Sequence, residues 1–288
     1  MAQNHRKTLH NIFARSIRLS SAALALPLIL ASLELTVRFA HAIPQKPFLV
    51  VVDPGHGGSD LGALEKHNGN VVYEKNITLS IGRLLVQELA RRKIQSVLTR
   101  NSDQEVDLPE RTAAANKLKA DIFISLHMNS AGGRNRANGV ETYILNRTDD
   151  QSSKRLADLE NKVLKGSVAK SYFESDVSLI VKDLILDRNL APSKRLACAV
   201  QSNLIHGQDA KIRNRGVRQG LFYVLLGADM PSVLVETGFM DDRLDLNRAL
   251  SPEGQQRIAA SIANAIDTYK SAQGQMKLKK SLTSCQVL

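Results

Sequence analysis

The stretch Phe48-Leu-Val-Val-Val-Asp-Pro-Gly-His-Gly-Gly58 passes from five apolar residues directly to an acid, a proline and a histidine set among three glycines. An apolar run of this length indicates a β-strand that is covered on both faces, as in the parallel sheet of an α/β protein. Such open sheets build their sites at the carboxyl ends of the strands. The stretch therefore predicts an α/β fold and makes His56 the first candidate site residue.

Helices and strands alternate along the chain after this first strand. Apolar residues at positions 77, 81, 84, 85 and 89 have helical spacing and predict a helix over 75–92. Ser251 and Pro252 are suited to begin a last helix that runs to about Tyr269. The pattern predicts one α/β domain over 48–270, with a mainly parallel, twisted sheet flanked by helices. The other strands are expected at 94–99, 121–126, 140–145, 221–225 and 232–236, and the other helices at 108–118 and 193–205.

Two segments do not follow this alternation. Residues 148–192 contain no clear strand, but they include an amphipathic helical pattern at 152–164 and an apolar piece at 177–186. They predict a helical insertion. Residues 271–288 are basic and poor in aromatic side chains, which is typical of a flexible tail.

The first 42 residues have the features of a secretory signal peptide. Basic residues precede an apolar run at 19–33, and Ala40-His-Ala42 matches a cleavage site of small residues. The run is shorter than the roughly 20 apolar residues that a spanning helix needs. We therefore expect cleavage after Ala42, a short linker at 43–47 and no stable membrane span in the exported chain. An uncleaved anchor is the alternative.

The charge of the chain favours an anionic polymer as partner. Residues 1–42 hold five basic residues and one acid and so account for +4 of the net charge of +11, which leaves +7 after cleavage. An exported protein rarely meets nucleic acid, and the chain has no tryptophan and no basic patch rich in aromatic residues for stacking bases. Nucleic acid is therefore not expected. The two cysteines, Cys198 and Cys285, are compatible with free thiols or with one bridge.

Three predicted strands and one helix bring metal-ligand side chains to the same edge of the sheet. His56 and His127 follow two strands, Glu236 ends a third, and Glu74 begins the first long helix. Two imidazoles and a carboxylate are a common ligand set for catalytic zinc. Taken singly, His56 could be a turn residue, His127 a hydrogen-bonded histidine at the edge of the core, Glu74 a helix cap, and Glu236 a buried and paired acid.

Taken in order, these residues stand in motifs that resemble a known family. The chain is similar over about 48–270 to the zinc-dependent N-acetylmuramoyl-L-alanine amidases of the bacterial cell-division and cell-wall lytic type. The matching motifs are Val51-Val-Asp-Pro-Gly-His-Gly-Gly58, Glu74 before Lys-Asn-Ile, Ser125-Leu-His127 with Asn129, Gly139-Val-Glu-Thr-Tyr143, Arg215-Gly-Val217 and Met230-Pro-Ser-Val-Leu-Val-Glu-Thr-Gly-Phe239.

The resemblance implies a role for each matching residue. His56, Glu74 and His127 would bind Zn²⁺, and Glu236 would act as the acid and base that transfers a proton from water to the leaving amine. The substrate would be peptidoglycan, and the bond cut would be the amide between N-acetylmuramic acid and L-alanine. Asp53 could orient a ligand imidazole or simply begin the turn.

Glu141 is a secondary candidate. It could be a further carboxylate of the metal site or a strand residue that is ion-paired to a nearby arginine. Arg215 and Arg218 could hold a peptide carboxylate or be solvated.

The insertion matches the position of a regulatory segment in the division-associated members of the family. The resemblance implies that its first helix blocks the zinc site, with Glu160 within reach of the metal, until an activator of the LytM-domain type binds at 177–190. An ordinary amphipathic hairpin packed on the core is the alternative. Together these features predict a periplasmic enzyme of cell division or wall remodelling. A zinc peptidase acting on stem peptides and an inactive wall-binding module are the competing functions.

Overall fold

The computed structural model describes residues 46–132, 137–162, 176–207, 212–273 and 285–288, with the side chains of 176–187 left out. The residues assigned to the signal peptide, most of the linker and most of the basic tail lie outside this part of the chain. Residues 47–288 form one compact unit. Within the described residues no helix combines the length and apolar character that crossing a membrane requires.

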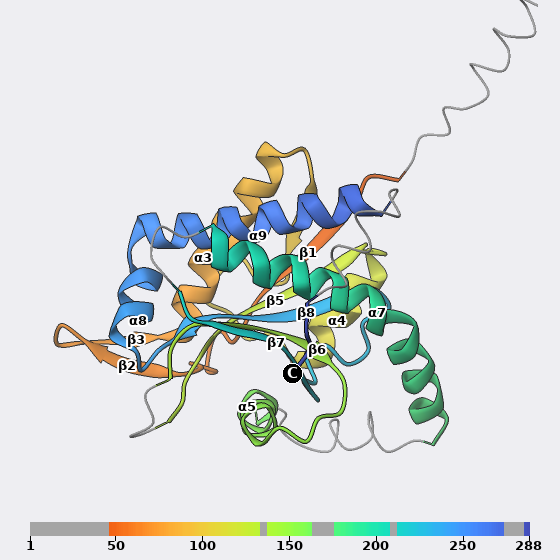
Figure 1. Ribbon diagram of the computed structural model, residues 1–288, viewed down its shortest axis with the longest axis horizontal. Coiled ribbons are helices and arrows are strands. Elements are labelled where there is room, and N and C mark those ends of the chain that lie inside the picture. Colours follow the sequence, from red (N-terminus) through yellow and green to blue (C-terminus); the bar gives the residue numbers. More distant parts are fainter. Residues whose placement is uncertain (1–45, 133–136, 163–175, 208–211, 274–284) are drawn as a thin grey trace, which may run out of the picture. The chain divides into compact units, whose positions relative to one another are not determined.

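A mixed six-stranded sheet forms the centre of this unit (Figure 1). Four parallel strands stand in the order β4-β1-β5-β8, and β6 then pairs antiparallel with β8 while β7 runs parallel to β6. The α/β class and the mainly parallel sheet predicted from the sequence are confirmed. The strands are β1 (Leu49–Pro54), β4 (Gln95–Leu98), β5 (Ile122–Asn129), β6 (Val140–Leu145), β7 (Asn214–Gly220) and β8 (Ser232–Phe239).

Helices cover both faces of the sheet, as the apolar run of β1 requires. Val50 and Val52 pack in one hydrophobic cluster and Val51 packs in another, because successive side chains of a strand point to opposite faces. The first cluster contains side chains of α3 (Glu74–Arg91), α7 (Asp176–His206) and α9 (Pro252–Ala272), which lie together on one face of the sheet (Figure 1). The second contains side chains of α4 (Leu108–Lys117) and α5 (Gln151–Asn161).

Three parts of the secondary structure differ from the prediction. Residues 221–225 form a turn rather than a strand, and the edge strand β7 precedes them. The chain also contains the hairpin β2 (Leu64–His67) and β3 (Asn70–Tyr73) and the helix α8 (Arg243–Leu250), none of which was expected. Helix α7 begins at Asp176 and continues through Pro192, so the second half of the predicted insertion belongs to the helix that packs on the core.

The predicted start of the last helix is confirmed. Ser251 is the N-cap of α9, its hydroxyl accepts a hydrogen bond from the Gly254 N–H at 3.1 Å, and Pro252 occupies the first position. In the same way Asp150 caps α5, since its carboxylate accepts from the Ser153 N–H at 2.8 Å. These caps fix where both helices begin.

Candidate metal centre

The loop after β1 turns sharply to present His56. This residue has φ of 62°, a left-handed conformation that costs a residue with a side chain on the order of 1–3 kcal/mol. The glycines beside it allow close packing: a Cβ on Gly55 would lie closer than 3.0 Å to atoms of the His127 ring, and Gly57 has φ of 131°. The loop thus brings the imidazoles of two strands together, with ring centroids 4.8 Å apart.

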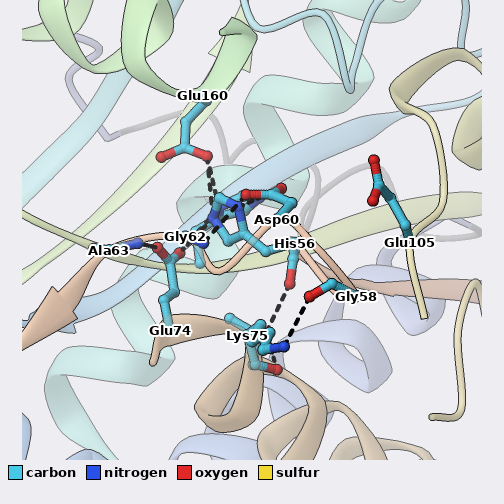
Figure 2. A network of polar contacts seen from close by, with 12 residues as sticks. His56, Gly58, Asp60, Gly62, Ala63, Glu74, Lys75, Glu105 and Glu160 are labelled. Atoms are coloured by element: carbon cyan, nitrogen blue, oxygen red, sulfur yellow. Dashed lines mark hydrogen bonds and ion pairs between the residues drawn. The ribbon is translucent and has the colours of Figure 1, made fainter. Parts of the chain in front are cut away.

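Four side chains offer ligand atoms that all lie within 4.8 Å of one another: His56, Glu74, His127 and Glu160. Nε2 of His56 lies 3.1 Å from Glu74 Oε1 and 3.4 Å from Glu160 Oε2. Nδ1 of His127 lies 3.2 Å and 3.0 Å from the same two oxygens. Glu74 and Glu160 approach His56 from opposite sides (Figure 2). The structure therefore brings the three predicted ligands together, and the secondary candidate Glu160 lies with them, as the resemblance implied.

Hydrogen bonds orient two of these four side chains. The second ring nitrogen of His56, Nδ1, lies 2.8 Å from Asp60 Oδ2. The Glu74 carboxylate accepts from the Ala63 N–H at 2.8 Å and from the Met128 N–H at 2.9 Å. Glu74 is the first residue of α3, but these partners come from other elements, so its carboxylate is aimed at the cluster. Outer contacts of this kind fix the direction of a metal ligand.

The charges of the cluster favour a cation at its centre. Burial disfavours the charged form of His56, but the carboxylates of Glu74 and Glu160 outweigh burial and raise the pKa of His56 to about 10. At His127, too, burial lowers the pKa and the carboxylates of Glu160 and Glu74 raise it. The carboxylates prevail, and the pKa of His127 rises to about 10. Burial also works against ionisation of Glu74, yet the imidazoles, His56 foremost, hold its pKa well below the usual range. A divalent cation would neutralise the carboxylates in place of the protons that otherwise charge the two imidazoles. The set of donor atoms therefore fits a metal ion.

Glu236 lies beside this cluster and is fully buried. It stands in register with His127, on the neighbouring parallel strand. Neither of its carboxylate oxygens has a hydrogen-bond partner among the described residues. Burial, followed by the charges of Glu160, Glu74 and Glu141, raises the pKa of Glu236 well above its usual value. A buried carboxyl group without a partner is costly to the fold, which points to a function.

Glu141 lies opposite Glu236 on β6 but does not join the cluster of ligand atoms. Its carboxylate forms an ion pair with Arg215 and accepts hydrogen bonds from Asn129 at 3.1 Å and from the Tyr143 hydroxyl at 2.9 Å. The ion-paired alternative is therefore the one that the structure shows. Arg215 and Arg218 are engaged with carboxylates of the chain rather than solvated.

Asp53 does not contact a ligand imidazole. Its buried carboxylate binds Arg111 at 2.8 Å and accepts from the hydroxyls of Thr99 and Ser125. Burial opposes its ionisation, but the guanidinium of Arg111 and the two hydroxyls keep the pKa of Asp53 below the usual value. Asp60 makes the contact instead. It lies only four residues after His56 in the same loop, which was the available signal in the sequence.

A cavity of about 560 Å³ opens onto the cluster. Two ligand residues, His56 and Glu74, lie in its wall together with the loop that follows β1. Helix α5 supplies much of the remaining wall through Arg155, Leu156, Leu159 and Glu160. The same helix therefore contributes a carboxylate to the cluster and borders the space through which a substrate would reach it.

The sheet and this buried cluster of histidines and glutamates define an α/β protein with a candidate metal centre at the carboxyl ends of its central strands. Residues 50–268 match the family model described as N-acetylmuramoyl-L-alanine amidase. The chain therefore belongs to the N-acetylmuramoyl-L-alanine amidase family.

Several curated proteins are related to the chain. The uncharacterized protein YqiI of Bacillus subtilis is 34% identical over 76% of this chain and 84% of its own length. AmiC of Escherichia coli O6:H1 is 32% identical over 78% of the chain. The probable amidase AmiB of Haemophilus influenzae is 30% identical over 85% of the chain. The matches span only 53% of that AmiC and 57% of that AmiB.

Solved structures of amidases share the fold. The N-acetylmuramoyl-L-alanine amidase of Clostridium difficile 630 superposes with a TM-score of 0.60 at 28% identity, over 79% of this chain and 99% of that one. AmiC2 of Nostoc punctiforme superposes with a TM-score of 0.56 at 33% identity, over 78% and 97% of the two chains. The family and the fold inferred from the sequence are confirmed.

Proposed function

We propose that the chain is a zinc-dependent N-acetylmuramoyl-L-alanine amidase, which hydrolyses the amide between the lactyl group of N-acetylmuramic acid and L-alanine in peptidoglycan. One observation carries the proposal: four ligand atoms meet beside a buried carboxyl group that has no partner among the described residues. Membership of the family supports the same bond and substrate.

His56, Glu74 and His127 would hold the zinc ion through Nε2, Oε1 and Nδ1, the atoms that face one another in the cluster. Zinc bound at such a set polarises a substrate carbonyl and lowers the pKa of water. Asp60 keeps Nε2 of His56 free for the metal because it occupies Nδ1 of the same ring.

Glu236 would move the proton in this reaction. Its carboxylate would take a proton from the attacking water and then give it to the nitrogen of the leaving L-alanine. The raised pKa of Glu236 helps the group keep the proton taken from water until the amine leaves, whereas an ordinary carboxyl group would lose that proton to solvent at neutral pH.

The test is Glu236→Gln, assayed on purified peptidoglycan with the zinc content measured in parallel. We expect a loss of activity of at least about 100-fold with zinc retained, since general acid–base catalysis contributes about 10²–10⁴-fold. Glu253→Gln, an exposed change in the first turn of α9, is the matched control. Full activity of Glu236→Gln would refute the mechanism. Mass spectrometry of the products identifies the bond, because only the amidase releases intact stem peptides with a free L-alanine amine.

The proposal includes autoinhibition by Glu160. Its Oε2 atom lies 3.4 Å from His56 Nε2 and 3.0 Å from His127 Nδ1, and so takes the place that water and substrate need. Glu160→Ala should therefore raise the activity measured without an activator, whereas Asp158→Ala, an exposed change on the same helix, should leave it unchanged. A fall in the activity of Glu160→Ala would instead make Glu160 a ligand that the active enzyme needs.

The remaining parts of the proposal concern the whole protein. The span of the family match supports a catalytic domain over 48–270. We assign 1–42 to a cleaved signal peptide, 43–47 to a linker and 271–288 to a basic tail whose end is tied to α7 by the Cys198–Cys285 disulfide, which gives a periplasmic enzyme of daughter-cell separation or wall remodelling. A LytM-domain activator would bind at 177–190, on the first half of α7, and draw the preceding helix away from the metal centre.

A further inference from the structure

Cationic side chains donate hydrogen bonds to the backbone carbonyls of the loop that presents His56. Arg100 donates to the carbonyl oxygens of Pro54 at 2.9 Å and Gly55 at 2.8 Å. Arg111 donates to those of Pro54 at 2.9 Å and His56 at 3.1 Å. Lys75 donates to the carbonyl of Gly58 at 2.8 Å (Figure 2). The left-handed conformation of His56 is therefore imposed by partners on both sides of it, as a strained residue requires.

Arg100 does more than hold this loop. Its Nη2 atom also donates to the Lys75 carbonyl at 2.8 Å and to the Thr78 hydroxyl at 3.1 Å, both near the start of α3. That helix begins with Glu74. One planar guanidinium thus joins the backbone next to His56 to the backbone next to Glu74.

Arg100 is well suited to this task because it is rigid and enclosed. Its side chain is only 1% exposed, and its planar fork bonds several acceptors at once, whereas the ammonium group of a lysine is a compact point charge. Thr78 completes the junction, since its hydroxyl donates to the Gly55 carbonyl at 2.9 Å. The buried carbonyls of the loop consequently have partners that also belong to the helix.

We propose that Arg100 is a positioning residue of the metal centre, which fixes the distance between the ligands His56 and Glu74 without touching the metal. The inference rests on the proposed zinc site. It assigns to Arg100 a role in metal affinity that is separate from its contribution to the stability of the fold.

The test compares the affinity for Zn²⁺ of the purified chain and of Arg100→Lys by competition with a chelator. Loss of a direct outer contact of a metal ligand costs about 10- to 100-fold in affinity. Arg100 acts through the backbone next to the ligands, so we expect a decrease at the lower end of this range, about tenfold. Ile262→Ala, a fully buried change in α9, is the matched control: it should lower the unfolding midpoint and leave the zinc affinity unchanged. With Co²⁺ bound, the visible spectrum of Arg100→Lys should differ from that of the wild type, and the spectrum of Ile262→Ala should not.

The zinc affinities separate failure of the Arg100 proposal from failure of the proposed zinc site. If Arg100→Lys binds zinc within twofold of the wild type, Arg100 has no positioning role. If the wild type itself does not bind zinc, the proposed function fails instead. Should Arg100→Lys not fold, Thr78→Val removes one donor of the same junction at nearly constant volume. It should lower the affinity by about fivefold, the effect of one ordinary hydrogen bond, and an unchanged affinity would overturn the proposal.

Discussion

At the scale of single residues, Gly55 shows how closely the metal centre is packed. A Cβ at this position would lie closer than 3.0 Å to three atoms of the His127 ring, which is itself enclosed by the cluster. We predict that Gly55→Ala displaces the imidazole and weakens zinc binding by at least about tenfold, as loss of a well-oriented ligand contact does. Competition with a chelator measures the effect.

Gly69→Ala provides the control for this prediction. Gly69 has a left-handed backbone, with φ of 80°, but a Cβ there meets nothing within 4 Å. The change should cost about 1 kcal/mol of stability because of the backbone strain and leave zinc binding intact. Equal zinc affinities for the two variants would show that the packing of Gly55 against His127 does not control the site.

The residues of this site differ in how far the sequence reveals them. His56, Glu74, His127 and Glu236 could be identified because each stands at the end or start of a predictable element. Asp60 gave only a weak signal, its position four residues after His56. Arg100 gave none, since it bonds mainly to backbone carbonyls and such contacts produce no periodic pattern. The partners of a loop backbone become visible only once the fold brings them together.

At the scale of elements, helix α5 is held in place at its first turn. The Asp150 carboxylate caps the helix and binds Arg218 at 2.7 Å, and Nε of Arg218 lies 3.5 Å from Glu141. We predict that Asp150→Ala loosens α5 and so releases Glu160 from the metal centre. Loss of a cap costs about 1 kcal/mol, which corresponds to about a fivefold rise in activity without an activator.

Ser251→Ala is the matched control, because it removes the cap of α9, a helix that does not border the cavity. It should lower stability by a similar amount without raising activity on purified peptidoglycan. Unchanged or reduced activity of Asp150→Ala would contradict the view that α5 blocks the site.

The elements themselves were predictable where apolar residues are periodic. The long helix α3 and the strands β1, β5 and β8 follow from such patterns. Strand β7 was missed because Asn214-Arg-Gly-Val-Arg-Gln-Gly220 is polar and contains two glycines. An edge strand tolerates such a sequence because one of its sides is not paired within the sheet. The strand expected at 221–225 is wrong since Phe222, Val224 and Leu225 are buried as a turn that packs on the second cluster, and apolar composition alone does not separate the two cases.

At the scale of the whole molecule, a disulfide joins Cys198 of α7 to Cys285, which settles the alternative left open by the sequence. The two cysteines are 87 residues apart. Closing a loop of this length lowers the conformational entropy of the unfolded chain, which is worth about 4.6 kcal/mol. We predict that Cys285→Ser lowers the free energy of unfolding in urea by about this amount, and that a reductant lowers the stability of the wild type to that of the variant. Equal stability of the variant and the oxidised wild type would contradict the prediction.

The segment anchored by this bridge also covers the edge of the sheet. Val287 pairs with Val217 of β7, and the Leu288 N–H donates to the Val217 carbonyl at 2.8 Å. Unpaired groups at a sheet edge are a template for pairing with another chain. Oxidation therefore protects solubility as well as stability: in a reducing compartment the same chain would hold this cover by non-covalent contacts alone, and the edge would open more readily to self-association.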